Sequence, residues 1–150
     1  MVSEIIKIVA SKYKGESANT ATIFDLATAT TATLQITIPE GWVYYLLAYG
    51  GNVQNTDEEI SINDKNGNII EQYSEFPDSF VRFDYPTPLT TAFKGSMSVR
   101  FTNSSGATDT ITFFVEGLII PLKNQIAFEE EVLGFPSFSR LLNEKAQKVI

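Results

Sequence analysis

Four oxygen-bearing side chains between residues 64 and 75 have a spacing that could bind a calcium ion. Asp64, Asn66, Asn68 and Glu75 occupy the first, third, fifth and twelfth positions of an EF-hand-type loop. Such a loop needs glycine at its sixth position, where this chain has Ile69, and its flanking segments here have strand-like sequence rather than helical sequence. The alternative, which we favour, is a two-residue Asn66-Gly67 hairpin turn between strands at residues 60–63 and 68–73.

Two other patterns could serve catalysis. Ser11 and Lys14 have the Ser-x-x-Lys spacing of some acyl-transfer enzymes, but the companion motifs of those enzymes are missing. The acidic runs at residues 57–59 and 129–131 could supply the carboxylate pair of a glycosidase, although runs of this kind more often form solvated loops. The chain has no Cys and no His, so it lacks thiolate chemistry, disulfides and the commonest general base. We therefore expect no enzyme activity, no cofactor and no metal site.

Aromatic residues could instead bind a ligand by stacking. The segment IPEGWVYYLLAYGG, residues 38–51, has strand-like sequence and contains Trp42, Tyr44, Tyr45 and Tyr49. Strict alternation would place Trp42 and Tyr44 on one face and Tyr45 and Tyr49 on the other. Together with Tyr73 and Tyr85, these side chains could form a sugar-stacking platform. They could instead fill the core and a seam between subunits, which is the interpretation we favour. Since both faces are apolar, something besides the core must cover the second face.

Composition limits the partners that the chain can have. The 150 residues are 43% hydrophobic and carry a net charge of −7, which predicts one globular domain repelled by nucleic acid. No apolar run approaches the roughly 18 residues of a membrane-spanning helix. The first apolar run is interrupted by Glu4 and Lys7, so it does not form a signal-peptide core. We expect a soluble protein made in the cytoplasm, with neither nucleic acid nor membrane as a partner.

Alternating hydrophobicity predicts an all-β fold, an antiparallel β-sandwich of jelly-roll type. Eight apolar residues should share its core: Ile36, Ile38, Ile60, Ile62, Val99, Phe101, Ile111 and Phe113. Turns are expected at residues 39–41, 50–51, 66–67, 85–88 and 103–106. Strands are expected at residues 5–10, 22–26, 34–38, 43–49, 59–63, 69–73, 80–83, 97–101 and 110–120.

The C-terminal region differs from the rest in its pattern. After the acidic run, Gly134-Phe135-Pro136 interrupts the chain, and Ser137 is a suitable N-cap for a helix over about residues 137–149. A helix of this length is marginally stable alone and needs a surface to pack on. We predict a sandwich domain over residues 1–121 and an arm over residues 122–150. Residues 127–150 of this arm should dock on a neighbouring subunit or another protein. The alternative is a helix folded back over strand 43–49. One helix face would carry Phe138, Leu141, Leu142, Ala146 and Val149.

Several segments together resemble the single jelly-roll structural proteins of virions. They are IPEGWVYYL, the Asn-Gly hairpin, FDYPTPL and RFTNSSGATDTITFFVEGLIIP, within residues 34–121. The resemblance is to capsid subunits, or to decoration and head-fibre proteins, of phages and archaeal viruses. It implies a non-enzymatic, symmetric homo-oligomer in the virion, whose terminal arms contact neighbours. Neither terminus is strongly basic, which favours an outer-shell or decorating role over contact with the genome.

The predicted function is therefore a capsid or capsid-decorating subunit that assembles through apolar outer strand faces and terminal arms. Its partners would be copies of itself and other virion proteins, and residues 127–150 would dock on either. The alternative is a carbohydrate-binding or adhesion module that uses the Trp42 and Tyr44 region. The predicted interface residues are Trp42, Tyr44, Tyr45, Tyr49, Phe135, Phe138, Leu141, Leu142 and Val149.

Overall fold

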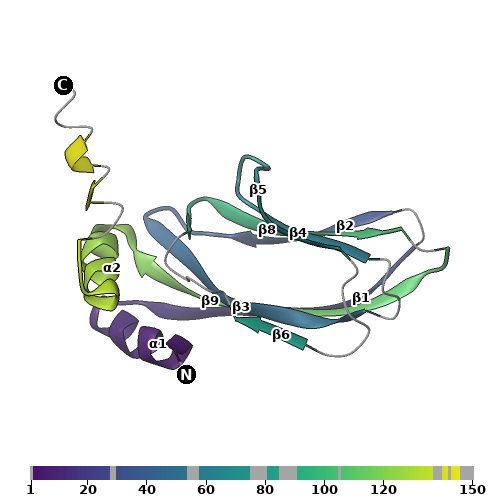
Figure 1. Ribbon diagram of the computed structural model, residues 1–150, viewed down its shortest axis with the longest axis horizontal. Helices are drawn as coiled ribbons and strands as arrows, with labels where there is room; N and C mark the ends of the chain where they lie inside the picture. Colours follow the sequence, from purple (N-terminus) through teal and green to yellow (C-terminus); the bar gives the residue numbers. More distant parts are fainter. Residues whose placement is uncertain are drawn as a thin grey trace.

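Two antiparallel sheets face each other, and two helices lie at one end of the sandwich (Figure 1). The computed structural model describes residues 2–27, 30–53, 58–74, 81–84, 91–104, 106–136, 140–141 and 143–145. The predicted turn at residues 85–88 lies outside the described residues. The strands are β1 (Glu16–Leu26), β2 (Thr31–Thr37), β3 (Trp42–Val53), β4 (Glu58–Asn63), β5 (Ile69–Ser74), β6 (Val81–Asp84), β7 (Ala92–Phe93), β8 (Ser96–Asn103) and β9 (Asp109–Pro121).

The strand order is that of a jelly roll. One sheet has the order β1-β9-β3-β6, with the short β7 also paired to β3, and the other has the order β2-β8-β4-β5. Leaving β7 aside, the first strand pairs with the last, the second with the seventh, the third with the sixth and the fourth with the fifth. This nested pairing is how a jelly roll closes two sheets over one core. The predicted fold class is confirmed.

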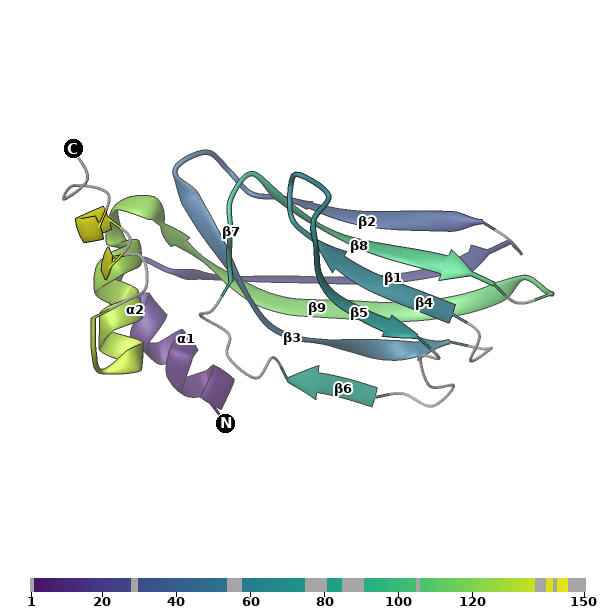
Figure 2. The same ribbon diagram turned by 45° about the horizontal axis from the view of Figure 1, so that its top comes forward.

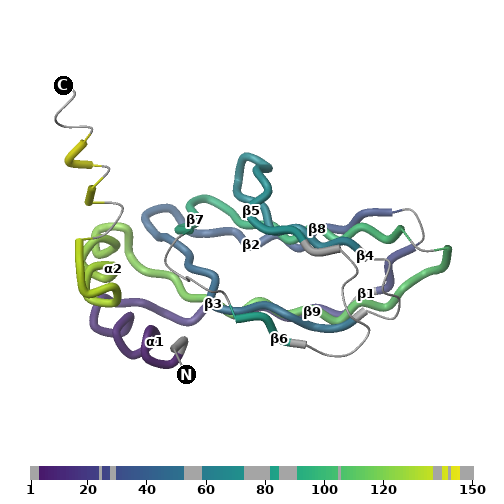
Figure 3. The backbone as a smooth tube through the Cα atoms, in the orientation of Figure 1, coloured from purple at the N-terminus to yellow at the C-terminus, as the bar shows by residue number. Residues whose placement is uncertain are grey.

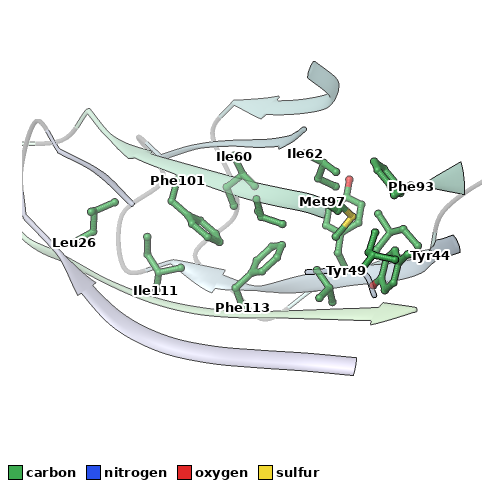
Figure 4. Packing of buried hydrophobic residues seen from close by; sticks show 14 residues of the cluster. Leu26, Tyr44, Tyr49, Ile60, Ile62, Phe93, Met97, Phe101, Ile111 and Phe113 are labelled. Carbon is green, nitrogen blue, oxygen red and sulfur yellow. The ribbon is translucent and has the colours of Figure 1, made fainter. Parts of the chain in front are cut away.

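The core between the sheets contains the residues that alternation predicted (Figure 4). Phe101 and Phe113 meet at its centre, edge to face, with their ring centroids 5.0 Å apart. Ile36 is half-buried at the margin of this cluster, and the other seven predicted residues are buried in it. The prediction of a shared core is therefore confirmed.

The predicted strand at residues 5–10 is wrong, because this segment belongs to helix α1 (Val2–Lys12). Its β-branched residues favour a strand by propensity, which tertiary packing can override. As a helix, the segment buries Ile6 and Ala10, one turn apart, in a single contact surface. The helix ends with the Gly15 N–H bonded to the Ala10 carbonyl at 2.8 Å, while Lys14 takes a left-handed φ of 65°.

The predicted turn at Gly50-Gly51 is also wrong, since both glycines lie inside β3. Gly51 has a φ of 146°, and a Cβ atom there would lie 1.9 Å from the carbonyl oxygen of Thr112 on β9. Glycine is therefore needed for the close approach of two backbones and not for a change of chain direction.

The predicted hairpin between β4 and β5 is confirmed, but its loop is one residue longer than expected. The Asp64 N–H bonds to the Asn68 carbonyl at 3.0 Å and the Gly67 N–H bonds to the Asp64 carbonyl at 3.1 Å. The loop consists of residues 65–67, and Gly67 adopts a φ of 82° in the position that such three-residue loops reserve for glycine. The Asp64 carboxylate also accepts the backbone N–H groups of Asn66 and Asn68, each at 2.9 Å.

We expect no calcium binding at this hairpin. The Asp64 carboxylate already accepts three hydrogen bonds within its own turn, and its pKa is lowered, chiefly by the Asn68 side chain. Calorimetric titration with CaCl₂ should give no stoichiometric isotherm up to millimolar concentration. An isotherm that disappears in Asp64→Ala would contradict this prediction.

The region after β9 contains a helix that the sequence did not predict. A 3₁₀ turn, η1 (Leu122–Asn124), leads into α2 (Gln125–Leu133), which ends where the Gly134 N–H bonds to the Glu130 carbonyl at 2.8 Å. Residues 140–141 and 143–145 are helical, within the predicted range of about 137–149. The remaining residues of that range lie outside the described part of the chain, so the boundaries of this helix stay a prediction.

Candidate functional site

Strand β3 carries aromatic side chains on both faces, and the chain itself covers both. Tyr44 and Tyr49 are buried in the core between the sheets, whereas Tyr45 is buried on the opposite face. The register between β3 and β9 shifts between Leu46 and Ala48, which marks a β-bulge. Because the bulge adds one residue, Tyr49 lies on the inner face instead of the outer face that strict alternation predicted.

A helical layer, formed by α1 and α2, covers the outer face of β3 and β9 at one end of the sheet (Figure 2). The Phe128 ring of α2 is fully buried, with its centroid 5.5 Å from that of Tyr45 and 6.2 Å from that of Tyr13. The prediction that residues 127–150 dock only on a neighbour is therefore wrong for residues 127–133. The buried residues between this helical layer and the outer face of β3 and β9 are Ile6, Ala10, Val43, Tyr45, Leu47, Leu118, Ile120 and Phe128.

A buried carboxylate fastens α2 to β3. Glu129 is 4% exposed and accepts the Tyr45 hydroxyl at 2.5 Å and the Gln125 side-chain amide at 3.2 Å. Burial, followed by this hydrogen bond, raises the pKa of Tyr45 well above its ordinary value, so the hydroxyl stays protonated and donates. The neighbouring Glu131 accepts the Lys12 ammonium at 3.2 Å and the Tyr13 hydroxyl at 3.0 Å. The acidic run is thus engaged in holding α1 and α2 in place.

A second ionic cluster fastens α1 and β6 to the outer face of β9. The Glu116 carboxylate accepts the Lys7 ammonium at 2.6 Å and the Arg82 guanidinium at 2.8 Å. Burial raises the pKa of Glu116, but the hydrogen bonds and charges of Lys7 and Arg82 outweigh it, so the net pKa is lowered. The sequence analysis did not identify this cluster, because its three residues lie on elements far apart in the chain.

The predicted aromatic platform is not open to solvent at the three tyrosines of β3. Trp42 is half-buried and packs against the core between the sheets, two residues before the buried Tyr44 on β3. The structure therefore places Tyr44, Tyr45 and Tyr49 within the chain's own interior and leaves Trp42 partly accessible.

Residues 140–141 and 143–145 lie beyond α2, at the helical end of the molecule (Figure 3). The segment after α2 carries large apolar side chains that are exposed to solvent. Phe135 is 62% exposed and Leu141 is 52% exposed. The Arg140 guanidinium donates to the Glu130 carboxylate, with Nη2 3.1 Å from Oε2, and this contact joins the segment to α2. The other predicted interface residues of this segment, Phe138, Leu142 and Val149, lie outside the described residues.

Neither a metal-binding group of side chains nor a membrane-spanning helix occurs in the described ranges. No group of three or more His, Cys, Asp or Glu side chains in these ranges has an arrangement that could hold a metal ion. Asp57 and Glu75, which the sequence singled out for possible carboxylate chemistry, lie outside them. None of the helices in the same ranges is both long and apolar enough to span a bilayer.

Comparison with known proteins does not assign the chain to a protein family. No protein-family model matches the chain, and no curated protein matches its sequence. Among solved structures, the chain is similar to a Bacillus endospore appendage pilus protein, with a TM-score of 0.44 and 14% identity over 72% of this chain and 90% of the other. The chain is also similar to the VP2 subviral particle of infectious bursal disease virus, with a TM-score of 0.43 and 12% identity over 75% of this chain and 34% of the other. A third similar structure is a CBM36-1 domain of a xylanase from a Trinervitermes trinervoides hindgut metagenome. Its TM-score is 0.37, with 8% identity over 70% of this chain and 96% of the other. At these values the likeness concerns only the arrangement of strands.

Proposed function

We propose that this chain is a non-enzymatic structural subunit of a virion, a capsid or capsid-decorating protein that assembles as a homo-oligomer. The observation that carries the proposal is the exposure of Phe135 and Leu141 beyond α2, where the chain leaves its own core. Fully burying a side chain of this kind contributes roughly 1.5–3 kcal/mol, so a partner that covers the exposed 62% of Phe135 and 52% of Leu141 would gain about 2–3 kcal/mol. The C-terminal segment is in this proposal the arm that contacts a neighbour.

The scaffold suits this role because it ties the arm to α2 at Arg140, within the described part of the chain. Phe128 and the buried Glu129 fix α2 to β3, and Arg140 then joins the arm to Glu130 on the same helix. An arm anchored to a rigid helix loses less conformational freedom on docking than one attached through a flexible linker. The net charge of −7 supports a position away from the packaged nucleic acid.

Carbohydrate binding through Trp42 and Tyr44 is the competing function. A stacking platform needs ring faces open to solvent, whereas Tyr44 is buried and Trp42 is half-buried. Trp42 is the single tryptophan of the chain, so its fluorescence reports directly on this position. Saturable fluorescence changes with soluble glycans would favour the carbohydrate-binding function over the one that we propose.

The arm is tested by comparing the full-length chain with a double variant, Phe135→Ala/Leu141→Ala, and with a chain truncated after Gly134. Light scattering should show that the full-length chain forms a large oligomer and that both altered chains lose it. Circular dichroism should show cooperative melting in all three, because the buried contacts of α2 lie before Gly134.

Ile69→Ala is the matched control, since Ile69 is also largely exposed but lies on β5, away from the arm. It should leave the oligomer unchanged. An unchanged oligomer in the double variant would contradict the proposal, and so would unfolding of the truncated chain, because the arm would then belong to its own core.

A further inference from the structure

The two sheets have one side with short, charged edge strands and one side with longer edge strands, whose charged residues are Glu16 and Asp25, near the two ends of β1. On the first side, β6 spans four residues and carries Arg82 and Asp84, while β5 carries Glu71 and pairs irregularly with β4. The other side is formed by β1 and β2 (Figure 2). These strands span 11 and 7 residues and pair in unbroken register with β9 and β8. Natural edge strands are usually protected by charges, bulges or shortness. The β1 and β2 edges have little such protection.

The core is also open along the β1 and β2 edges. The inward side chains of β2, Ala32, Leu34 and Ile36, are only half-buried, whereas those of β4, Ile60 and Ile62, are buried. A cavity of about 230 Å³ lies between the two edges, lined by Thr22, Ala32, Thr33 and Leu34. A further strand paired with β2 would cover these apolar side chains. It would also form hydrogen bonds with the backbone groups on the outer edge of β2.

We propose that a second copy of this chain occupies these edges, through antiparallel pairing of β2 with β2 and of β1 with β1 about one two-fold axis. In the fully overlapping register, Leu34 lies opposite Leu34 of the second copy. Ala32 then lies opposite Ile36, and Thr31 opposite Thr37. Strand β2 contains no charged residue, so this edge is where two copies that each carry a charge of −7 meet with least repulsion.

Strand β1 is self-complementary in the same way. Its fully overlapping register centres on Ala21 and places Glu16 opposite Leu26 and Asp25 opposite Ser17, so no two acidic residues lie directly opposite each other. Like charges placed directly opposite would destabilise the pair.

One two-fold axis can relate both pairs of edge strands, because the centres of the two registers, Leu34 on β2 and Ala21 on β1, lie close together. Thr22, next to Ala21, lines the same cavity as Thr33 and Leu34. A two-fold axis perpendicular to the sheets near this cavity would therefore pair both edges at once and extend each sheet into the second copy.

This inference rests on the proposed function only in treating the chain as a homo-oligomer, and disulfide trapping tests it separately. The chain has no Cys, so a single introduced Cys reports on one contact. Residues that face themselves across antiparallel strands have Cβ atoms about 4.5–5.5 Å apart, within or just beyond disulfide reach. Under mild oxidation, full-length Ala21→Cys and Leu34→Cys should each form a covalent dimer.

Two matched variants should not form this dimer. Ile23→Cys lies on the same exposed face as Ala21, but the register separates the two copies of residue 23 by about 13 Å. Gln72→Cys lies on β5, at the opposite edge of the second sheet. Adding Thr33→Lys, at an exposed position of β2, should abolish the Ala21→Cys dimer.

Absence of the dimer in both Ala21→Cys and Leu34→Cys would overturn the inference, and so would equal cross-linking of Ile23→Cys and Gln72→Cys. Adding Phe135→Ala/Leu141→Ala to Ala21→Cys separates the two proposals. A covalent dimer that persists while the large oligomer is lost supports both. A large oligomer that persists when neither trapping variant forms the dimer refutes the edge contact and leaves assembly intact.

Discussion

Replacing Phe113 with Ala is expected to lower the free energy of unfolding by about 3–5 kcal/mol. The Phe113 ring is fully buried between the sheets, 5.0 Å from the Phe101 centroid and 6.2 Å from the Tyr49 centroid. Truncation removes buried apolar surface and leaves a cavity that the two sheets cannot close without disturbing their register. Phe101→Ala should cost a similar amount, since the two rings pack on each other. Urea denaturation followed by circular dichroism measures the loss.

Ile23→Ala provides the control for these core variants. Ile23 lies on β1, next in the sheet to β9, but its side chain is largely exposed, so the change should be within about 0.5 kcal/mol. A loss below about 1 kcal/mol at both Phe101 and Phe113 would mean that the strand faces are assigned wrongly.

Phe128→Ala is expected to have the second large effect, also about 3–5 kcal/mol, although it lies outside the sandwich core. Its ring joins α2 to β3 through Tyr45 and to the turn after α1 through Tyr13. Since β3 and β9 contribute side chains to both buried clusters, the loss should appear in the global unfolding transition. Chemical denaturation should therefore shift the helical and strand signals together.

Leu133→Ala is the control on the same helix. This side chain is partly exposed at the end of α2, so truncation should cost less than about 1 kcal/mol. Early loss of the helical signal in Phe128→Ala, with the strand signal unchanged, would show instead that the helical layer unfolds independently.

Local alternation determined the β-sandwich. In β2, β4, β8 and β9, apolar residues recur at every second position, and one buried face per strand is enough to predict which side chains meet. The Asp64 hairpin was likewise predictable, because Asn66-Gly67 lies between two such strands. These features depend on neighbours along the chain, so the sequence alone carries them.

The cover of the outer face was decided only by the tertiary structure. Residues 5–10 have strand propensity, but the outer apolar face of β3 and β9 favours a helix that places Ile6 and Ala10 against it. The bulge at Leu46–Ala48 moves Tyr49 inward because of the pairing of β3 with β9, and nothing in the order of residues indicates it. Likewise, Glu116 meets Lys7 and Arg82 only after the jelly roll has formed. Contacts between residues far apart in the chain depend on the closed fold, and they determine which apolar surfaces remain for a partner.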